Sequence, residues 1–372
     1  MTTPAGTPRR TPLHDVHGAL GASFTDFAGW QMPVRYGSET AEHRAVRTRV
    51  GLFDLTHMGE IELTGPGAAA ALDHALVGRA SAIGVGRARY SMICAEDGGI
   101  IDDLVVYRLA EEHFLVVANA SNVAVVAPEL AARAEGYDAA VRDTSADWAL
   151  LAVQGPASAA IVAGLTDLDV VSLRYYAIDA GTLAGADVLL ARTGYTGEDG
   201  FEVYCRPADA GAVWAALREA GEPHGLVPAG LACRDTLRLE AGMPLYGHEL
   251  TRDVTPFEAN LGRVVAFDKP AGFVGDAALA RRKEQGPQRV LVGLVASGRR
   301  SPRAGYRVVD PGTGAEVGVV TSGAPSPTLE RPIAMAFVPP ALAAPGTRLA
   351  VSLRGALETA DVVELPFYTR PR

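Results

Sequence analysis

Two adjacent aspartates interrupt an otherwise apolar segment of the chain. In the string DGGIIDDLVVY (residues 97–107), Asp102 and Asp103 lie in a run that is typical of a strand. Successive side chains of a strand point to opposite faces, so one carboxylate is expected to point inward and the other to meet solvent or a salt bridge. An inward carboxylate is unfavourable unless it is paired or used, for example to bind a cationic or N–H-rich ligand or to transfer a proton. The alternative is that both aspartates cap the loop or bind a cation.

A glycine-rich turn leads directly into a strand that carries a glutamate. The string RTGYTGEDGFEVY (residues 192–204) holds Tyr195 within the turn and continues with Glu202 between Phe201 and Val203. A carboxylate at this position can accept two hydrogen bonds from an amino-pyrimidine edge, where N–H donors lie side by side. The alternative is a strand glutamate that faces water.

A helical run carries two arginines one turn apart. In AGLACRDTLRLEAGMPLYGHEL (residues 229–250), Arg234 and Arg238 fall on one helix face, and the helix is expected to stop at Gly242. Such a pair can hold a carboxylate of a ligand or steady Asp and Glu side chains. The alternative is a salt-bridged surface helix.

The usual signatures of phosphate, dinucleotide, zinc and serine-hydrolase chemistry are absent from the sequence. It contains no GxxxxGK[ST], no helix-opening GxGxxG, no HExxH and no GxSxG. Among the eight histidines, His57 in DLTHMGEI has the most suggestive setting, and we expect a structural role for it. Without a CxxC pair, the three cysteines are expected to be buried small hydrophobes: Cys94, Cys205 and Cys233.

Composition narrows the class of protein further. The chain has 372 residues, 48% of them hydrophobic, so two or three folded domains are expected. A formal net charge of −9 disfavours broad contact with nucleic-acid phosphates or anionic lipid. No apolar stretch of about 18 residues is present, and the first residues lack the apolar segment of a signal peptide. We therefore expect a cytoplasmic protein with no nucleic-acid, membrane or metal role.

The elements that must position these residues change in character along the chain. Up to Gly286-Pro287, β-rich runs alternate with short helices, and ELTGPGAAAAL (62–72) and LAVQGPASAAI (151–161) share a strand–Gly-Pro–helix plan. Beyond it, short strands separated by Gly/Pro turns are typical of a small barrel or sandwich, at 290–295, 316–321, 332–338, 348–353 and 361–365. The pattern predicts an α+β body followed by an all-β domain.

Five long motifs, in this order along the chain, resemble the glycine cleavage system T protein, an aminomethyltransferase family. They are FAGWQMPVRYGS, GLFDLTHMGEI, RYSMICAEDGGIIDDLVVY, RTGYTGEDGFEVY and RDTLRLEAGMPLYGHEL. The resemblance implies a three-domain cloverleaf around a central folate channel. Its body would be residues 1–285, in two α+β lobes of approximately 1–55 with 140–250 and 56–139 with 251–285, followed by a β-barrel at 286–372.

The resemblance also implies a reaction in glycine catabolism and one-carbon metabolism. The family transfers the methylene of the aminomethyl group on lipoylated H protein to tetrahydrofolate. The products are 5,10-methylenetetrahydrofolate, ammonia and dihydrolipoyl H protein. Tetrahydrofolate would thus be the co-substrate and lipoylated H protein the partner.

The same resemblance assigns roles to residues of this chain. The essential aspartate of the family matches Asp102, its pterin-binding glutamate matches Glu202, and its arginine near the folate matches Arg234. Other matches line the predicted pocket or its lipoyl entrance. The pocket positions are Tyr90, Tyr195, Met58 and Asn119, and those toward the entrance are Arg303 and Tyr368.

A local basic cluster lies on this acidic chain, formed by Arg299, Arg300 and Arg303. We expect it to meet an acidic carrier protein, because complementary charge speeds encounter. The alternative is a solvated turn.

Two alternatives keep the folate fold but change the function. Related demethylases take a methyl or methylene from a small amine or sulfonium, and the complete DGGIIDD, GYTGEDGFE and RDTLRLEAG strings favour the lipoyl-linked enzyme instead. A folate-binding iron–sulfur maintenance factor carries a cysteine in a KGC-type motif, and no cysteine of this chain has that setting.

Overall fold

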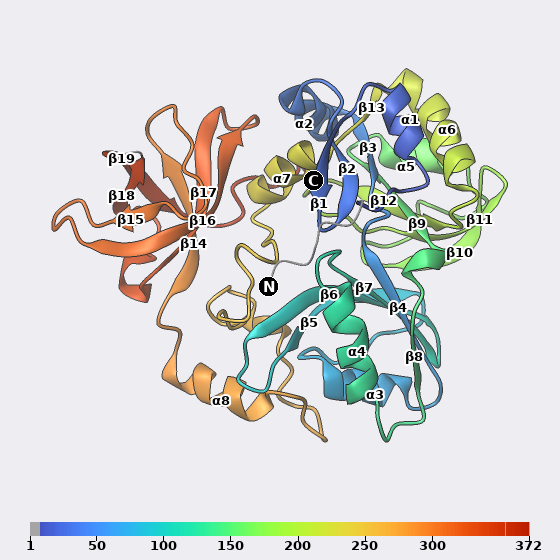
Figure 1. The fold of residues 1–372 in the computed structure, drawn as a ribbon, viewed down its shortest axis with the longest axis horizontal. Helices are drawn as coiled ribbons and strands as arrows, with labels where there is room; N and C mark the ends of the chain where they lie inside the picture. Colours follow the sequence, from blue (N-terminus) through green and yellow to red (C-terminus); the bar gives the residue numbers. More distant parts are fainter. Residues whose placement is uncertain (1–7, 354, 372) are drawn as a thin grey trace. The chain divides into compact units, whose positions relative to one another are not determined.

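The computed structural model describes residues 8–353 and 355–371, and within them the fold is mixed α+β (Figure 1). Two compact units can be distinguished. The first comprises the chain up to Ala68, Ile83–Arg89 and Val105–Asp235, and the second comprises Ala69–Ala82, Tyr90–Leu104 and the chain from Thr236 onward. The predicted two-lobe division of residues 1–285 stays a prediction.

The first unit contains a six-stranded sheet in the order β10-β11-β12-β9-β3-β13. All neighbouring strands are antiparallel except β13, which runs parallel to β3. Strand β9, with the sequence ALLAVQ, is buried along its whole length. The strands are β3 (Val50–Asp54), β9 (Ala149–Gln154), β10 (Ile178–Leu183), β11 (Ala186–Ala191), β12 (Gly200–Cys205) and β13 (Leu226–Pro228).

Helix α6 (Ala210–Gly221) shows how this sheet obtains its core. Val213, Trp214 and Leu217 recur at helical spacing and are buried in the same apolar cluster as Leu151 of β9. Helix α2 begins at Ser38, whose hydroxyl accepts the Ala41 N–H at 3.3 Å. The other elements of the first unit are α1 (His14–Ala19), β1 (Ser23–Phe27), β2 (Trp30–Arg35), α2 (Glu39–Thr48), α4 (Val123–Arg133), η1 (Ser145–Asp147), α5 (Ser158–Ala163) and η2 (Glu222–His224).

A five-stranded sheet has the order β5-β6-β7-β4-β8. The strand predicted within DGGIIDDLVVY is present as β6. The chain passes between the two units inside β5, β6, α3 and α7. These elements are β4 (Gly59–Thr64), α3 (Ala68–Ala75), β5 (Arg87–Cys94), β6 (Ile100–Ala110), β7 (His113–Ala118), β8 (Ala140–Asp143) and α7 (Leu231–Glu240).

The predicted strand–Gly-Pro–helix repeat is confirmed, and its glycines have a physical reason. Gly65 follows β4 with φ +116°, and Gly155 follows β9 with φ +134°, a region that favours glycine. A Cβ on Gly65 would lie 2.6 Å from the Asp138 carbonyl oxygen, and one on Gly155 would lie 2.5 Å from that of Arg49. Both turns therefore need glycine for conformation and for space.

The predicted C-terminal β domain is a closed barrel in the order β14-β17-β16-β15-β18-β19, in which β14 also pairs with β19. Closure leaves no free strand edge. Strand β15 was not predicted, because three residues are too short to show alternation. Strand β19 begins five residues earlier than predicted, since polar side chains hide its start. The strands are β14 (Val290–Ala296), β15 (Arg307–Val309), β16 (Glu316–Ser326), β17 (Arg331–Val338), β18 (Arg348–Leu353) and β19 (Ala356–Val363).

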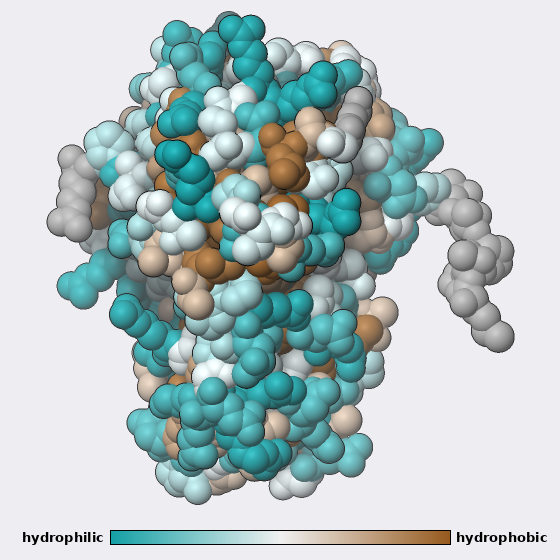
Figure 2. Space-filling view, turned by 90° about the vertical axis from the view of Figure 1, so that its left-hand side faces the viewer, coloured by the Kyte–Doolittle hydropathy of each residue, from teal (hydrophilic) through white to brown (hydrophobic). Residues whose placement is uncertain are grey.

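The barrel has its own apolar interior, and its outside is largely polar. Leu294, Val320, Ala336 and Val351 belong to one buried cluster. On the face of the molecule shown in Figure 2, hydrophilic residues predominate and hydrophobic ones form small patches. The barrel is preceded by α8 (Asp276–Gln285), which is followed by Gly286 with φ +73°, at the boundary predicted near Gly286-Pro287. The remaining short helices of the second unit are η3 (Gly262–Val264) and η4 (Pro340–Leu342).

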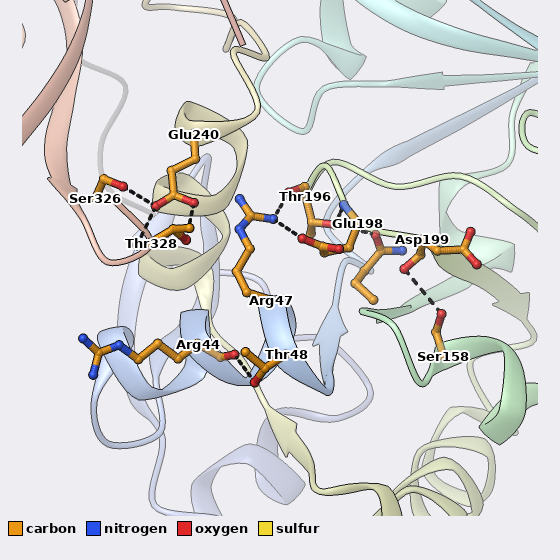
Figure 3. Close-up of polar contacts among 11 residues, drawn as sticks. Arg44, Arg47, Thr48, Ser158, Thr196, Glu198, Asp199, Glu240, Ser326 and Thr328 are labelled. Carbon is orange, nitrogen blue, oxygen red and sulfur yellow. Dashed lines mark hydrogen bonds and ion pairs between the residues drawn. The ribbon is translucent and has the colours of Figure 1, made fainter. Parts of the chain in front are cut away.

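The end of α7 is anchored within the second unit by buried charges. The Arg238 Nη1 lies 2.9 Å from the Glu249 carboxylate, its Nη2 donates to the Ser322 hydroxyl at 2.7 Å, and both charged side chains are at most 1% exposed. Figure 3 shows Glu240 accepting hydrogen bonds from Ser326 and Thr328. The alternative of a salt-bridged surface helix is therefore wrong for this end of α7.

Arg238→Met keeps most of the side-chain volume but leaves Glu249 buried without its cation. An uncompensated buried charge costs about 3–5 kcal/mol, so we expect the free energy of unfolding to fall by that amount in urea denaturation. The double variant Arg238→Met/Glu249→Gln should recover part of the loss, because it removes the stranded charge. A single variant as stable as the parent chain would contradict this role of the pair.

Candidate active site

The residues predicted to form the site divide between the two units. Those in the first unit are Met58, Asn119, Tyr195, Glu202 and Arg234, and those in the second are Tyr90, Asp102, Arg303 and Tyr368.

Glu202 is partly buried on β12, and two hydroxyl groups orient its carboxylate. The Thr193 hydroxyl donates to Glu202 Oε2 at 2.5 Å, and the Tyr107 hydroxyl donates to the same oxygen at 3.3 Å. The two hydroxyls are themselves 2.9 Å apart. Glu202 is therefore not a strand glutamate that simply faces water; it is held in one orientation by neighbours from β6 and from the turn before β12.

Arg234, near the start of α7, lies over the ring of Tyr195, with its Cζ 4.8 Å from the ring centroid. Its Nη1 is buried and makes no hydrogen bond within the part of the chain that the structure describes. Burial lowers the pKa of the Arg234 guanidinium, and the charge of Glu202 opposes that shift. A buried N–H without an acceptor is costly, so the arrangement is suited to a ligand that supplies one.

We call Tyr107, Thr193, Tyr195, Glu202 and Arg234 the Glu202 cluster. It combines an oriented carboxylate, an aromatic face and a buried guanidinium with an unsatisfied donor. Such a set can bind a flat heterocycle that has adjacent N–H donors and a nearby acceptor atom. Tyr195, Glu202 and Arg234 were predicted from the sequence, whereas Tyr107 and Thr193 were not, although both lie inside the strings at 97–107 and 192–204.

Glu60 is a second buried acid that the sequence analysis did not single out. It is 1% exposed, and its Oε1 has no hydrogen-bond partner among the described residues. Burial raises its pKa well above the usual range, and the charges of Asp143 and Glu202 raise it further. Glu60 and Glu62 lie two residues apart on β4 and therefore share one face of the sheet, so the alternation in the sequence does not show that Glu60 is buried whereas Glu62 is only partly buried.

His57 is buried, as expected for a structural histidine. It contacts Phe27 edge to face, with ring centroids 5.4 Å apart. Burial and the nearby charge of Arg234 lower its pKa to about 4, although Asp54 opposes the shift. Met58 and Asn119 are partly buried, at the turn before β4 and at the end of β7. Their place in the pocket stays a prediction.

In the second unit, the two aspartates of β6 lie as strand alternation predicts. Asp102 is fully buried, whereas Asp103 is partly buried and accepts a hydrogen bond from the Tyr90 hydroxyl at 3.1 Å. The start of the strand is fixed by the Ile100 N–H, which donates to the Val254 carbonyl at 3.0 Å. Asp102 is therefore the inward carboxylate, and its chemical role stays a prediction.

The two residues predicted near the lipoyl entrance have different settings. Arg303 is exposed and donates to the Gly323 carbonyl at 3.4 Å. The Tyr368 N–H donates to the Glu240 carbonyl at 2.8 Å, which fastens the C-terminal segment to the end of α7. All three cysteines are buried, as predicted, and no disulfide bond joins them within the described residues.

Other features of the described residues complete the account. Within residues 8–353 and 355–371, no helix is long and apolar enough to cross a membrane, and no three His, Cys, Asp or Glu side chains are grouped to hold a metal ion. A cavity of about 640 Å³ in the first unit, lined by Arg87, Leu168 and Ile178 among others, contains none of the predicted site residues.

Comparison with known proteins defines the class. Residues 13–269 match the GCVT N-terminal domain, and residues 289–369 match the glycine cleavage T-protein C-terminal barrel domain. The chain is 62% identical over 364 residues to the aminomethyltransferase of Saccharopolyspora erythraea (98% of this chain, 99% of that protein). It is 44% identical over 363 residues to that of Bacillus subtilis (97% and 99%).

A solved structure agrees with these matches. The glycine cleavage system aminomethyltransferase T from Bartonella henselae is 38% identical, with a TM-score of 0.91 over 97% of this chain and 98% of that one. These similarities define an aminomethyltransferase, an enzyme that transfers one-carbon groups. The chain belongs to the glycine cleavage T-protein family. The predicted family, fold class and enzyme class are confirmed.

The buried neutral His57 generates a pH prediction. Its native pKa of about 4 lies below the ordinary value of 6.5, so between these values the unfolded chain binds a proton that the native chain does not. Stability is therefore lost as pH falls from 6.5 to 4, by about 3 kcal/mol for this group. We expect His57→Gln to lose correspondingly less stability over that range in urea unfolding. Parallel pH profiles of the two proteins would show that His57 is not the responsible group.

Proposed function

We propose that this chain transfers the methylene of the aminomethyl group on lipoylated H protein to tetrahydrofolate. The products are 5,10-methylenetetrahydrofolate, ammonia and dihydrolipoyl H protein. We further propose that the reaction takes place in the cytoplasm, which the composition favours. Membership of the glycine cleavage T-protein family supports the reaction, and the Glu202 cluster is the single structural observation that carries it.

The Glu202 cluster matches the chemistry of a pterin. The amino-pyrimidine edge of a pterin presents adjacent N–H donors. The Glu202 carboxylate, oriented by the Thr193 and Tyr107 hydroxyls, can accept hydrogen bonds from them. The buried Nη1 of Arg234 needs an acceptor, which a ring carbonyl or a carboxylate of the folate can supply. Tyr195 adds an aromatic face against that guanidinium. We assign Tyr90, Met58 and Asn119 to folate binding as well, as the family resemblance implies.

The reaction needs no nucleophile from the protein, because tetrahydrofolate supplies N5 for attack on the one-carbon unit. The protein's work is then positioning, which can lower a barrier by several kcal/mol, and stabilisation of charge. The transferred carbon has iminium-like, cationic character, and a buried carboxylate favours such a cation. We assign this role to Asp102, which can also orient or relay a proton of the folate nitrogens. We assign Arg303 and Tyr368 to the lipoyl entrance.

The direct test is an assay of purified chain with tetrahydrofolate and H protein whose lipoyl arm carries the aminomethyl group. Ammonia and methylenetetrahydrofolate should form together, and neither should form when tetrahydrofolate is omitted. Small amine and sulfonium donors serve as the comparison for a demethylase. Turnover of these donors without turnover of aminomethylated H protein would replace the proposed function by the demethylase alternative.

The role of Asp102 is tested by Asp102→Asn, which keeps the shape of the side chain and removes its charge. We expect kcat to fall at least about a hundredfold, or about 3 kcal/mol of transition-state stabilisation, with tetrahydrofolate still bound. Asp103→Asn is the matched control, because Asp103 is the adjacent carboxylate on the same strand and is less buried than Asp102. Near-normal turnover of Asp102→Asn would remove the assignment.

The basic cluster of Arg299, Arg300 and Arg303 is tested by reversing its charge. All three side chains belong to exposed residues, so their replacement by glutamate should leave the fold intact. We expect the KM for H protein to rise about tenfold at low salt, and less at high salt, with kcat little changed. Arg348→Glu is the control, because Arg348 is an exposed arginine on β18 and lies outside the segment between β14 and β15 that carries the cluster. An unchanged KM would favour the solvated-turn alternative.

A further inference from the structure

The turn between β11 and β12 carries two members of the Glu202 cluster, Thr193 and Tyr195, and is held by several side-chain contacts. Arg192 at its start and Asp199 at its end form a two-point ion pair, with N···O distances of 3.0 and 2.7 Å. This pair closes the turn from the outside. Two further side chains hold it from the inside, and neither belongs to the proposed folate-binding set.

The first inner anchor is the side-chain amide of Gln154, the last residue of β9, which is fully buried. Its Nε2 donates to the Thr193 carbonyl at 3.0 Å, and its Oε1 accepts the Thr196 hydroxyl at 2.9 Å. One amide thus fixes the backbone on one side of Tyr195 and a side chain on the other. A buried amide with both ends satisfied has one allowed position.

The glycines of the turn leave the space that this amide occupies. A Cβ on Gly194 would lie 2.0 Å from Gln154 Oε1, and a Cβ on Gly200 would lie 2.4 Å from Gln154 Nε2. Neither glycine has a positive φ, so backbone conformation does not explain why these two positions are glycine. Positive φ occurs at Gly197 of the same turn. Gly194 and Gly200 are therefore required by the amide between them.

The second inner anchor is Arg47 of α2, shown in Figure 3 reaching toward Thr196 and Glu198. Its Nη1 donates to the Thr196 carbonyl at 2.6 Å and to Glu198 Oε1 at 2.9 Å. The Arg47 and Glu198 side chains are only 5% and 3% exposed. An arginine from a distant part of the sequence thus holds the second half of the turn.

These anchors act on the ligand-facing atoms through the turn. Gln154 holds the carbonyl of Thr193, and the Thr193 hydroxyl orients Glu202. Gln154 also holds Thr196, which directly follows Tyr195, the residue whose ring lies against Arg234. We propose that Gln154 is a positioning residue for folate binding, with Arg47 as its second support. The proposal rests on the proposed function, because it takes the Glu202 cluster to be the folate site.

The test uses Gln154→Leu, which keeps a similar volume and removes both hydrogen bonds. We expect the Kd for tetrahydrofolate, measured by calorimetry, to rise about tenfold or more, the size that losing buried hydrogen bonds produces. The KM for H protein and kcat at saturating folate should change little. Hydrogen exchange of the amides of residues 193–199 should accelerate, which reports on the anchor independently of activity.

Two further variants separate positioning from general damage. In Gln154→Glu, the protonated carboxyl can donate to the Thr193 carbonyl as the amide does, whereas the carboxylate cannot. The folate affinity of this variant, expressed as a ratio to that of the parent protein, should therefore rise as pH falls. Gly194→Ala should weaken folate binding by displacing the amide. Its effect should be smaller in a Gln154→Ala background, where the clash is gone. Thr166→Val, which removes one hydrogen bond elsewhere in the unit, is the control for lost stability.

The outcomes distinguish this inference from the proposed function. If the parent chain binds no tetrahydrofolate, the proposed function fails, whatever the variants do. If the parent chain binds it and a folded Gln154→Leu binds equally well, the positioning role is overturned. Additive effects of Gly194→Ala and Gln154→Ala, or a Thr166→Val variant that weakens folate binding as much as Gln154→Leu, would also count against it.

Discussion

The cost of burying charge is the constraint on which the first unit depends. Arg234 is placed where burial lowers its pKa, where Glu202 opposes that shift, and where one of its N–H groups finds no acceptor in the described chain. A protein that only needed stability would replace such a group with an apolar one. Its presence, together with an oriented carboxylate and a ring beneath it, is explained by a ligand that completes the hydrogen bonds.

Two buried ionisable side chains near the Glu202 cluster, His57 and Glu60, have pKa values shifted toward their neutral forms. His57 carries a lowered pKa beside Arg234 and therefore stays neutral near physiological pH, and Glu60 carries a raised pKa beside Glu202. Each shift has burial as its largest cause, and each avoids a second charge of the same sign in the cluster.

The second unit uses buried charge for a different purpose. Arg238 and Glu240, at the end of α7, are satisfied by Glu249, Ser322, Ser326 and Thr328, so helix and barrel are held together by paired polar groups. Asp102 is the inward carboxylate of the same unit, on a strand whose next residue turns outward to Tyr90. These paired side chains hold the end of α7 against the barrel, whereas Arg234 in the first unit belongs to the Glu202 cluster of the proposed function.

The sequence by itself determined the family, the strand–Gly-Pro–helix repeat, the all-β character of the last part, and the strands that carry Asp102 and Glu202. These features are local, because periodicity, turn glycines and long motifs are written in neighbouring residues. Only the tertiary structure decided that the last strands close into a barrel and include β15, and that Arg238 is buried rather than on the surface. It alone revealed the partners of Glu202, the burial of Glu60 and the anchoring by Gln154 and Arg47, because each depends on residues 9 to 151 positions apart in sequence meeting in space.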